Sequence, residues 1–189
     1  KENFKTHYGE KSGDKMFTQL EYNLSNASGV LYKIGHVGEH YTISLCTPIM
    51  QRAAYELKQS SEILFVDATS NCNVQNHKFN FLQQSPAGGI PLGCTITTSQ
   101  KSEVFHVAVQ IEIFPTKIYP SVIVTDDDMA KRNTLKKYWP NSVLLLCTFH
   151  VLKAVWKWVC LTKNNIDKAD RQISYHLFRN ILLFKLKTD

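Results

Sequence analysis

Two short apolar runs of the chain each end in an aspartate. Residues 62–66 lead into Asp67, and residues 121–125 lead into Asp126. Runs of four to five consecutive apolar or β-branched residues are typical of strands covered on both faces of a sheet. An acid at the carboxyl end of such a strand lies at the rim of the sheet, where open α/β folds bind their ligands. The pattern therefore predicts two carboxylates that converge on one metal ion.

Three further segments have strand-like patterns, at residues 78–82, 90–98 and 142–146. The connections between the Asp67 strand and the next two are short, which favours an antiparallel meander. Helical spacing of apolar residues predicts helices at residues 103–114 and 129–138, and a third that follows the last strand and starts near residue 150.

These elements give the order βββαβαβα. The helix at residues 103–114 is a crossover connection, which makes the Asp126 strand parallel to the Asp67 strand. We therefore predict an α/β fold with a mixed five-stranded sheet flanked by helices. Both acids then lie at the same rim of the sheet.

The N-terminal region has a weaker pattern. We interpret residues 1–60 as a connecting region with a helix near residues 48–59, in which Pro48 occupies the first turn. Residues 31–34 and 41–45 are short strand candidates, and residues 20–28 resemble a polar connector. Residues 61–189 are predicted to form the main domain.

Charge is distributed unevenly along the 189 residues. Residues 131–189 carry 12 Lys and Arg against 3 Asp and Glu, whereas residues 1–130 carry 10 against 13. A basic C-terminal third accompanies nucleic-acid contact in many proteins, although a solvated, lysine-rich helical face has the same composition. The composition, 43% hydrophobic and 20% charged, is that of a globular protein, and no apolar run is long enough for a transmembrane helix. Five dispersed cysteines favour a reducing compartment over a disulfide framework.

Several ordered motifs resemble the transposase domain of Mutator-like elements (MULE), a branch of the DDE transposases with a ribonuclease H-like fold. The resemblance covers roughly residues 60–160. It depends on Phe-Val-Asp-Ala-Thr at 65–69, Gly-Ile-Pro-Leu-Gly at 89–93, Val-Thr-Asp-Asp-Asp at 124–128, Trp-Pro at 139–140, Cys-Thr-Phe-His at 147–150 and Trp156 in the helix that follows.

The resemblance implies a role for several residues. Asp67 matches the first catalytic acid of the family and Asp126 the second, and Cys147 and His150 match its Cys-x-x-His motif, with His150 near the scissile phosphate. The third acid of the family, usually Glu on a later helix, has no counterpart here, because no Glu follows Glu112. We therefore expect an incomplete core, part of a longer protein, with the last catalytic helix beyond residue 189. Residues 68–71 also lack the glycine that is common in the family's first turn.

The chemistry of this family cleaves and rejoins phosphodiesters. Two metal ions can stabilise the attacking and leaving oxygens, and Mg²⁺ (or Mn²⁺) suits the role because it takes few protein carboxylates. Two carboxylates about 4 Å apart repel by about 4 kcal/mol at an effective dielectric constant near 20, and a bound cation reverses that penalty. Asp67 and Asp126 are the expected metal ligands.

Each candidate also has a structural interpretation. An aspartate after a strand is often a turn residue or a helix N-cap, an explanation that suits Asp127 or Asp128 better than Asp126. Cys147 and His150 form either part of a zinc site, which Cys160 and His176 could complete, or a buried thiol beside a hydrogen-bonded imidazole. Trp156 is expected in the core. The predicted contacts with the DNA backbone are the cations that follow the acidic site: Lys131, Arg132, Lys136 and Lys137.

The leading hypothesis is a fragment of a DNA transposase core that acts in the nucleus on transposon ends and target DNA. This hypothesis includes no membrane association, and a homo-oligomer is one assembly compatible with it. Whether the chain is an active enzyme stays open, because the third acid is missing. A domesticated, non-catalytic DNA-binding or chromatin-associated protein is the main alternative. A marginally folded remnant, or a ribonuclease or exonuclease on the same fold, is also compatible with the pattern.

Overall fold

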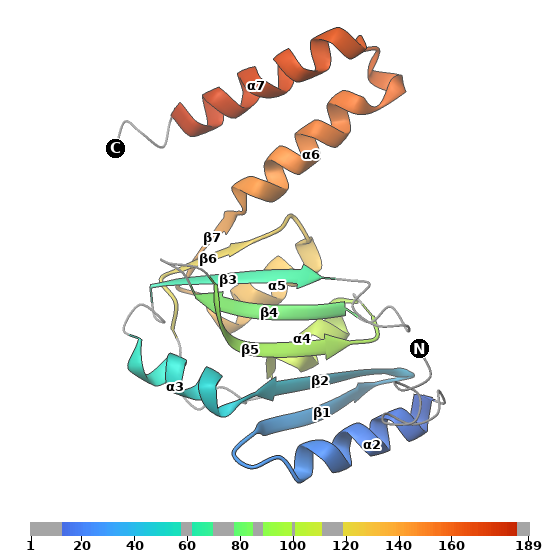
Figure 1. Cartoon of the computed structure of the whole chain (residues 1–189), viewed down its shortest axis with the longest axis vertical. Coiled ribbons are helices and arrows are strands. Elements are labelled where there is room, and N and C mark those ends of the chain that lie inside the picture. The colour runs from blue at the N-terminus through green and yellow to red at the C-terminus, as the bar shows by residue number, and fades with distance from the viewer. Residues whose placement is uncertain are drawn as a thin grey trace, which may run out of the picture.

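The computed structural model describes residues 13–57, 62–69, 78–84, 89–99, 101–110 and 119–184. In this part of the chain seven strands form one sheet, in the order β1-β2-β5-β4-β3-β6-β7 (Figure 1). The elements, in chain order, are α2 (Gly13–Ser25), β1 (Leu31–Val37), β2 (His40–Cys46), α3 (Pro48–Glu56), β3 (Ile63–Thr69), β4 (Lys78–Gln84), β5 (Ile90–Thr97), α4 (Ser102–Gln110), β6 (Val122–Thr125), α5 (Met129–Tyr138), β7 (Val143–Leu146), α6 (Thr148–Cys160), η2 (Thr162–Asn164) and α7 (Lys168–Phe184).

The sheet is mixed, as the sequence predicts. Strands β3, β4 and β5 form an antiparallel meander, and β3, β6 and β7 run parallel to one another. The crossover prediction is confirmed, because β6 lies beside β3 in parallel register. Helix α4 lies between β5 and β6 along the chain, and the last residues predicted for it, 111–114, lie outside the described residues.

The prediction of five strands is wrong, since β1 and β2 extend the same sheet. They form a hairpin with a two-residue turn, in which Gly38 has φ +57, and β2 pairs with β5. A glycine at the first central position of such a turn matches the twist of the two strands. Helix α2 also covers most of the segment expected to be a polar connector. The helix predicted near residues 48–59 is present as α3, which Thr47 caps, while residues 58–59 lie outside the described part.

One face of the sheet carries the main hydrophobic core. Helices α3, α4 and α5 contribute to it, and α4 and α5 lie behind the strands in Figure 1. The alternation of a strand places every second residue on this face. The buried residues are Leu64 and Val66 of β3, Leu92 of β5, Ile123 of β6, Ala54 of α3, Phe105 and Val109 of α4, and Leu135 of α5.

Helix α6 leads away from the β7 edge of the sheet, and α7 turns back at the far end of α6 (Figure 1). A 3₁₀ turn joins them, and Asn165 there takes a left-handed conformation with φ 51. Trp156 of α6 packs edge-to-face on Tyr175 of α7 and stays 42% exposed. The expectation that Trp156 belongs to the core is therefore wrong, because its helix packs against another helix instead of the sheet. None of the described helices is long and apolar enough to cross a membrane.

Burial divides the described cysteines into two kinds, all of them free thiols. Cys46 and Cys94 are buried, and burial raises the pKa of each thiol to about 11. Because the thiolate is the reactive form, about one molecule in a thousand carries it at pH 8. Cys147 and Cys160 are partly exposed.

We therefore expect a thiol-alkylating reagent at pH 8 to label Cys147 and Cys160 in the native protein within minutes. Cys46 and Cys94 should react at a comparable rate after unfolding in urea. Peptide mass spectrometry measures each site separately. Rapid native labelling of Cys46 or Cys94 would contradict the burial on which this prediction depends.

Candidate active site

The candidate site lies at the carboxyl ends of the three parallel strands. The register pairs Phe65 with Val124 across β3 and β6, and Val124 with Leu145 across β6 and β7. Two residues further along each strand come Asp67, Asp126 and Cys147. A step of two residues keeps the side chains on one face of the sheet. The parallel register thus brings together two acids that lie far apart in the sequence.

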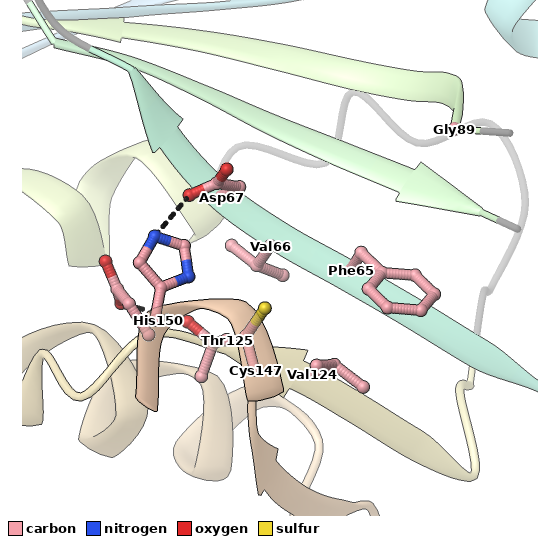
Figure 2. Close-up of a pocket in the computed structure, with 9 residues that line it drawn as sticks. Phe65, Val66, Asp67, Gly89, Val124, Thr125, Cys147 and His150 are labelled. Atoms are coloured by element: carbon pink, nitrogen blue, oxygen red, sulfur yellow. Dashed lines mark hydrogen bonds and ion pairs between the residues drawn. The ribbon is translucent and has the colours of Figure 1, made fainter. Parts of the chain in front are cut away.

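These residues line one pocket with a volume of about 260 Å³. Figure 2 shows β3 on one side and the start of α6 on the other. The pocket is lined by Phe65, Val66, Asp67, Gly89, Val124, Thr125, Asp126, Cys147 and His150. Asp67, Asp126 and His150, the three residues predicted to be catalytic, therefore share one cavity.

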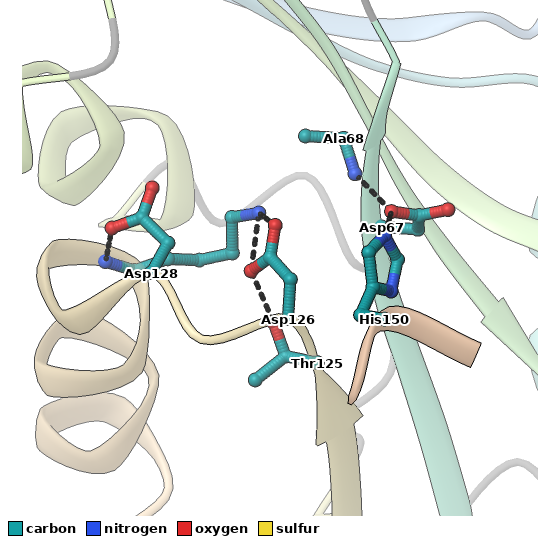
Figure 3. A network of polar contacts seen from close by, with 7 residues as sticks. Asp67, Ala68, Thr125, Asp126, Asp128 and His150 are labelled. Carbon is teal, nitrogen blue, oxygen red and sulfur yellow. Dashed lines mark hydrogen bonds and ion pairs between the residues drawn. The ribbon is translucent and has the colours of Figure 1, made fainter. Parts of the chain in front are cut away.

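Asp67 faces His150 across this pocket. The Asp67 Oδ1 to His150 Nε2 distance is 3.6 Å, and Oδ1 also accepts a hydrogen bond from the backbone N–H of Ala68 at 2.8 Å (Figure 3). The Asp67 side chain is 59% exposed. His150 Nδ1 is buried and has no hydrogen-bond partner among the described residues. Asp67 is thus open to a ligand, and His150 retains an unused nitrogen.

Asp126 has a different environment, because a lysine already neutralises it. Lys131 Nζ donates to Asp126 Oδ1 at 3.0 Å and to Oδ2 at 2.9 Å, and the Thr125 hydroxyl donates to Oδ1 at 3.2 Å (Figure 3). The lysine side chain is 5% exposed and the aspartate side chain 24%. Burial by itself raises the pKa of Asp126, but the hydrogen bond and charge of Lys131, together with hydrogen bonds from Thr125 and from the backbone of Asp128, outweigh it, so the pKa is lowered. The carboxylate therefore stays ionised at neutral pH.

The start of helix α5 explains how the lysine reaches the acid. Asp128 is the N-cap, and its side chain accepts a hydrogen bond from the backbone N–H of Lys131 at 3.2 Å. This cap orders the first turn, from which the lysine side chain returns to the end of β6. The structural interpretation offered for Asp128 is thus confirmed. The spacing Asp126-x-Asp128-x-x-Lys131 is the sequence signal for this arrangement, which our sequence reasoning missed.

Each of the four cations predicted to contact DNA has a contact within the protein. Lys131 is buried against Asp126, so its predicted contact with DNA is corrected to an ion pair within the site. Arg132 donates to the carbonyls of Leu144 and Leu145 at 3.4 Å, and Lys136 donates to that of Ser142 at 2.9 Å. The Lys137 Nζ lies 3.5 Å from His106 Nε2. Arg132 and Lys136 thus link α5 to β7, while DNA contact by Arg132, Lys136 and Lys137 stays a prediction.

The donor set fits a hard divalent cation in type. Two carboxylates at one pocket are the number that Mg²⁺ usually takes from a protein. Among the described residues no group of three or more His, Cys, Asp or Glu side chains is placed to hold a metal. Cys160 and His176 therefore do not complete a zinc set with Cys147 and His150.

The lowered pKa of Asp126 gives a pH dependence of stability. A carboxylate whose folded-state pKa lies below its unfolded value stabilises the fold above about pH 4, and the contribution is lost as pH falls through the folded pKa. We expect urea unfolding between pH 6 and pH 3 to show a steeper loss of stability in the wild type than in an Asp126→Asn/Lys131→Met variant. Parallel pH profiles would show that the ion pair contributes little.

Comparison with protein-family models identifies most of this region. The model of the MULE transposase domain matches residues 63–154. Over this segment the chain is similar to the MULE transposase domain family. The match confirms the resemblance expected from the sequence, and it contains Asp67, Asp126, Cys147 and His150. No curated protein matches the chain.

The match to the MULE transposase domain thus extends from β3 to the middle of α6, and it includes every residue that lines the pocket. A domain of this family implies a transposase-related function and an interaction with DNA in general. Strands β1 and β2, which precede the matched residues, join the sheet of the MULE domain through β5.

Proposed function

We propose that this pocket is the active site of a DNA transposase core, in which Asp67 and Asp126 hold a divalent cation for phosphodiester cleavage and strand transfer. The observation that carries the proposal is the parallel pairing of β3 and β6, which brings both acids into one pocket within the MULE domain. We further propose that β5-β4-β3-β6-β7 is a ribonuclease H-like sheet, since three antiparallel strands are followed by two parallel ones. Action in the nucleus, where chromosomal DNA lies, is part of the same proposal.

The position of each residue in the pocket gives it a separate role in this proposal. Mg²⁺, when bound, supplies electrostatic stabilisation of the attacking and leaving oxygens. Asp67, which is more exposed than Asp126, faces incoming ligand directly. His150 lies beside Asp67 at the pocket, with its Nε2 3.6 Å from Asp67 Oδ1, where a phosphate would bind. The N-terminus of α6 lies at the same place, and its free N–H groups attract an anion.

The test is DNA cleavage by the purified full-length protein that contains this chain, with Mg²⁺ or Mn²⁺. Asp67→Asn is expected to lower the rate by about 10²–10³-fold, the range for loss of one electrostatic group aimed at the transition state. Asp127→Asn is the matched control, because Asp127 is an exposed aspartate beside the site. Cleavage that persists in EDTA, or that Asp67→Asn leaves unchanged, would refute a metal-dependent site at this pocket.

Helix α6 offers a surface that DNA could follow away from the pocket. Phe149, Lys153 and Lys157 are exposed and recur every four residues, so they form one stripe along the helix. Lys153 Nζ lies 5.8 Å from the centre of the Phe149 ring. Cations beside an exposed aromatic ring are suited to phosphates and to base stacking. We include this stripe in the proposed DNA-binding surface.

Salt dependence tests this surface. A Lys153→Gln/Lys157→Gln variant is expected to reduce the slope of log affinity against log salt by about 2, since each phosphate contact contributes about 0.9. The matched control is Lys33→Gln/Lys101→Gln, which removes the same charge from exposed lysines outside α6. Fluorescence anisotropy with a labelled duplex gives both slopes. Equal slopes for the two double variants would remove α6 from the proposed surface.

One observation favours a second candidate function, non-catalytic DNA binding by a domesticated transposase. The carboxylate of Asp126 is already satisfied by Lys131, so the fold does not need a metal at that position. Under this alternative, DNA affinity is the same in Mg²⁺ and in EDTA, and Asp67→Asn has no effect on it. A divalent-cation requirement that Asp67→Asn removes would favour the transposase.

A further inference from the structure

Lys131 places a buried positive charge inside the pocket that the proposed function assigns to a metal. Its ammonium group lies 2.9 and 3.0 Å from the two carboxylate oxygens of Asp126, and its side chain is 5% exposed. Lysine is almost never buried this deeply without a charged partner. The ion pair is therefore built into the site and is not a chance contact of two surface side chains.

The ammonium and a metal ion would use the same lone pairs. An ionised carboxylate only accepts, and here both Asp126 oxygens accept from Lys131, while Oδ1 also accepts from the Thr125 hydroxyl. A divalent cation needs at least one of these oxygens as a ligand. The Lys131 ammonium and a divalent cation therefore disfavour each other at Asp126, because both need the same carboxylate oxygens and because their like charges repel.

Charge leads to the same conclusion. With His150 neutral, Asp67 and Asp126 contribute two negative charges to the pocket, and Lys131 cancels one of them. The site with the lysine in place is therefore half neutralised before any metal arrives. Without the lysine charge, the two carboxylates would balance one divalent ion.

We propose that Lys131 is the resident counter-ion of Asp126 and competes with divalent cations for that carboxylate, so that this lysine sets the metal affinity of the pocket. The inference rests on the proposed metal site. It assigns Lys131 a positioning role, because the lysine holds Asp126 in the pocket while no metal is bound and weakens the binding of a metal when one is present.

The experiment measures Mn²⁺ binding directly, by isothermal titration calorimetry and by electron paramagnetic resonance of free Mn²⁺, without DNA. Lys131→Met keeps the apolar stem and removes the charge, and it is expected to tighten Mn²⁺ binding by about tenfold or more. Lys131→Gln removes the charge but keeps a hydrogen-bond donor, as a second variant if the first is poorly folded. The matched control is Lys33→Met on β1, an exposed lysine at the far edge of the sheet, which should change the affinity by less than about twofold.

The outcomes separate the two proposals. Tighter Mn²⁺ binding in both Lys131 variants, abolished when Asp126→Asn is added, supports the competition. Equal affinity in the wild type and in both Lys131 variants overturns it and leaves the metal site intact. Absence of Mn²⁺ binding at millimolar concentrations in every variant overturns the metal site itself, and the competition with it.

Discussion

Replacing Asp126 with alanine is expected to lower the free energy of unfolding by about 2–4 kcal/mol. The substitution leaves the ammonium of Lys131 without its partner in a side chain that is 5% exposed. Removing one member of a fully buried pair costs about 3–5 kcal/mol, and the value here is lower because Asp126 is partly exposed. Urea denaturation followed by circular dichroism measures the change.

A second substitution identifies the cause. Lys131→Met removes the unpaired charge and fills nearly the same volume, so the Asp126→Ala/Lys131→Met variant should recover most of the lost stability. Asp127→Ala is the control, since this exposed neighbour should change the free energy by less than about 0.5 kcal/mol. If Asp126→Ala and Asp127→Ala had equal effects, or if Lys131→Met gave no recovery, the buried charge would not explain the loss.

Replacing Ile123 with alanine is expected to lower the free energy of unfolding by about 2–5 kcal/mol. Ile123 is fully buried in β6, between Leu64 of β3 and Leu144 of β7, and belongs to the main core. The substitution removes apolar contacts and leaves a cavity that the packed strands cannot close. Chemical denaturation gives the magnitude, and the slope of the transition should stay unchanged.

The same substitution on α7 is the control. Ile173 is 59% exposed, so Ile173→Ala should change stability by less than about 0.5 kcal/mol. Because β6 ends at Thr125 and carries Asp126 beyond it, a loosened β6 should also increase the acid sensitivity of the fold. Equal losses for the Ile123 and Ile173 variants would mean that β6 is not at the centre of the core.

These stability effects affect the choice of variants for functional work. Asp126 has a structural role through Lys131, so loss of activity in an Asp126 variant has two possible causes. Asp67 is 59% exposed and its contacts are with the backbone of Ala68 and with His150. Asp67→Asn should therefore leave stability nearly unchanged, and it gives the cleaner test of chemistry.

The sequence by itself predicted much of the framework of the site. Consecutive apolar residues before Asp67 and Asp126 predicted two buried strands, and the helix between them predicted their parallel pairing, because crossover connections of this kind join parallel strands. The same local pattern predicted the meander and the helix at Met129–Tyr138. The motifs were also sufficient to indicate the MULE family, which the match at residues 63–154 confirms.

The strand number and the exposure of Trp156 depended on contacts between distant segments. The apolar pattern of β1 and β2 is weak, and whether they extend the sheet depends on the free edge that β5 offers. Helical spacing gave Trp156 an apolar face, but that face meets Tyr175 of α7 instead of the sheet. Spacing predicts which residues share a face of a helix and says nothing about the element that this face contacts.

The electrostatics of the pocket are the clearest case of what only the tertiary structure decided. In the sequence, Lys131 is one of several cations after the acidic site. The neighbouring lysines and arginine were equally good candidates for a buried partner of the acid. The Asp128 cap orders the first turn of α5, from which the Lys131 side chain reaches Asp126 and is buried away from water. The sequence determined which acids meet at the strand ends, since that follows from local pattern and parallel register. Which cation neutralises Asp126 depends on the burial of that cation, and burial arises only when separate elements pack together.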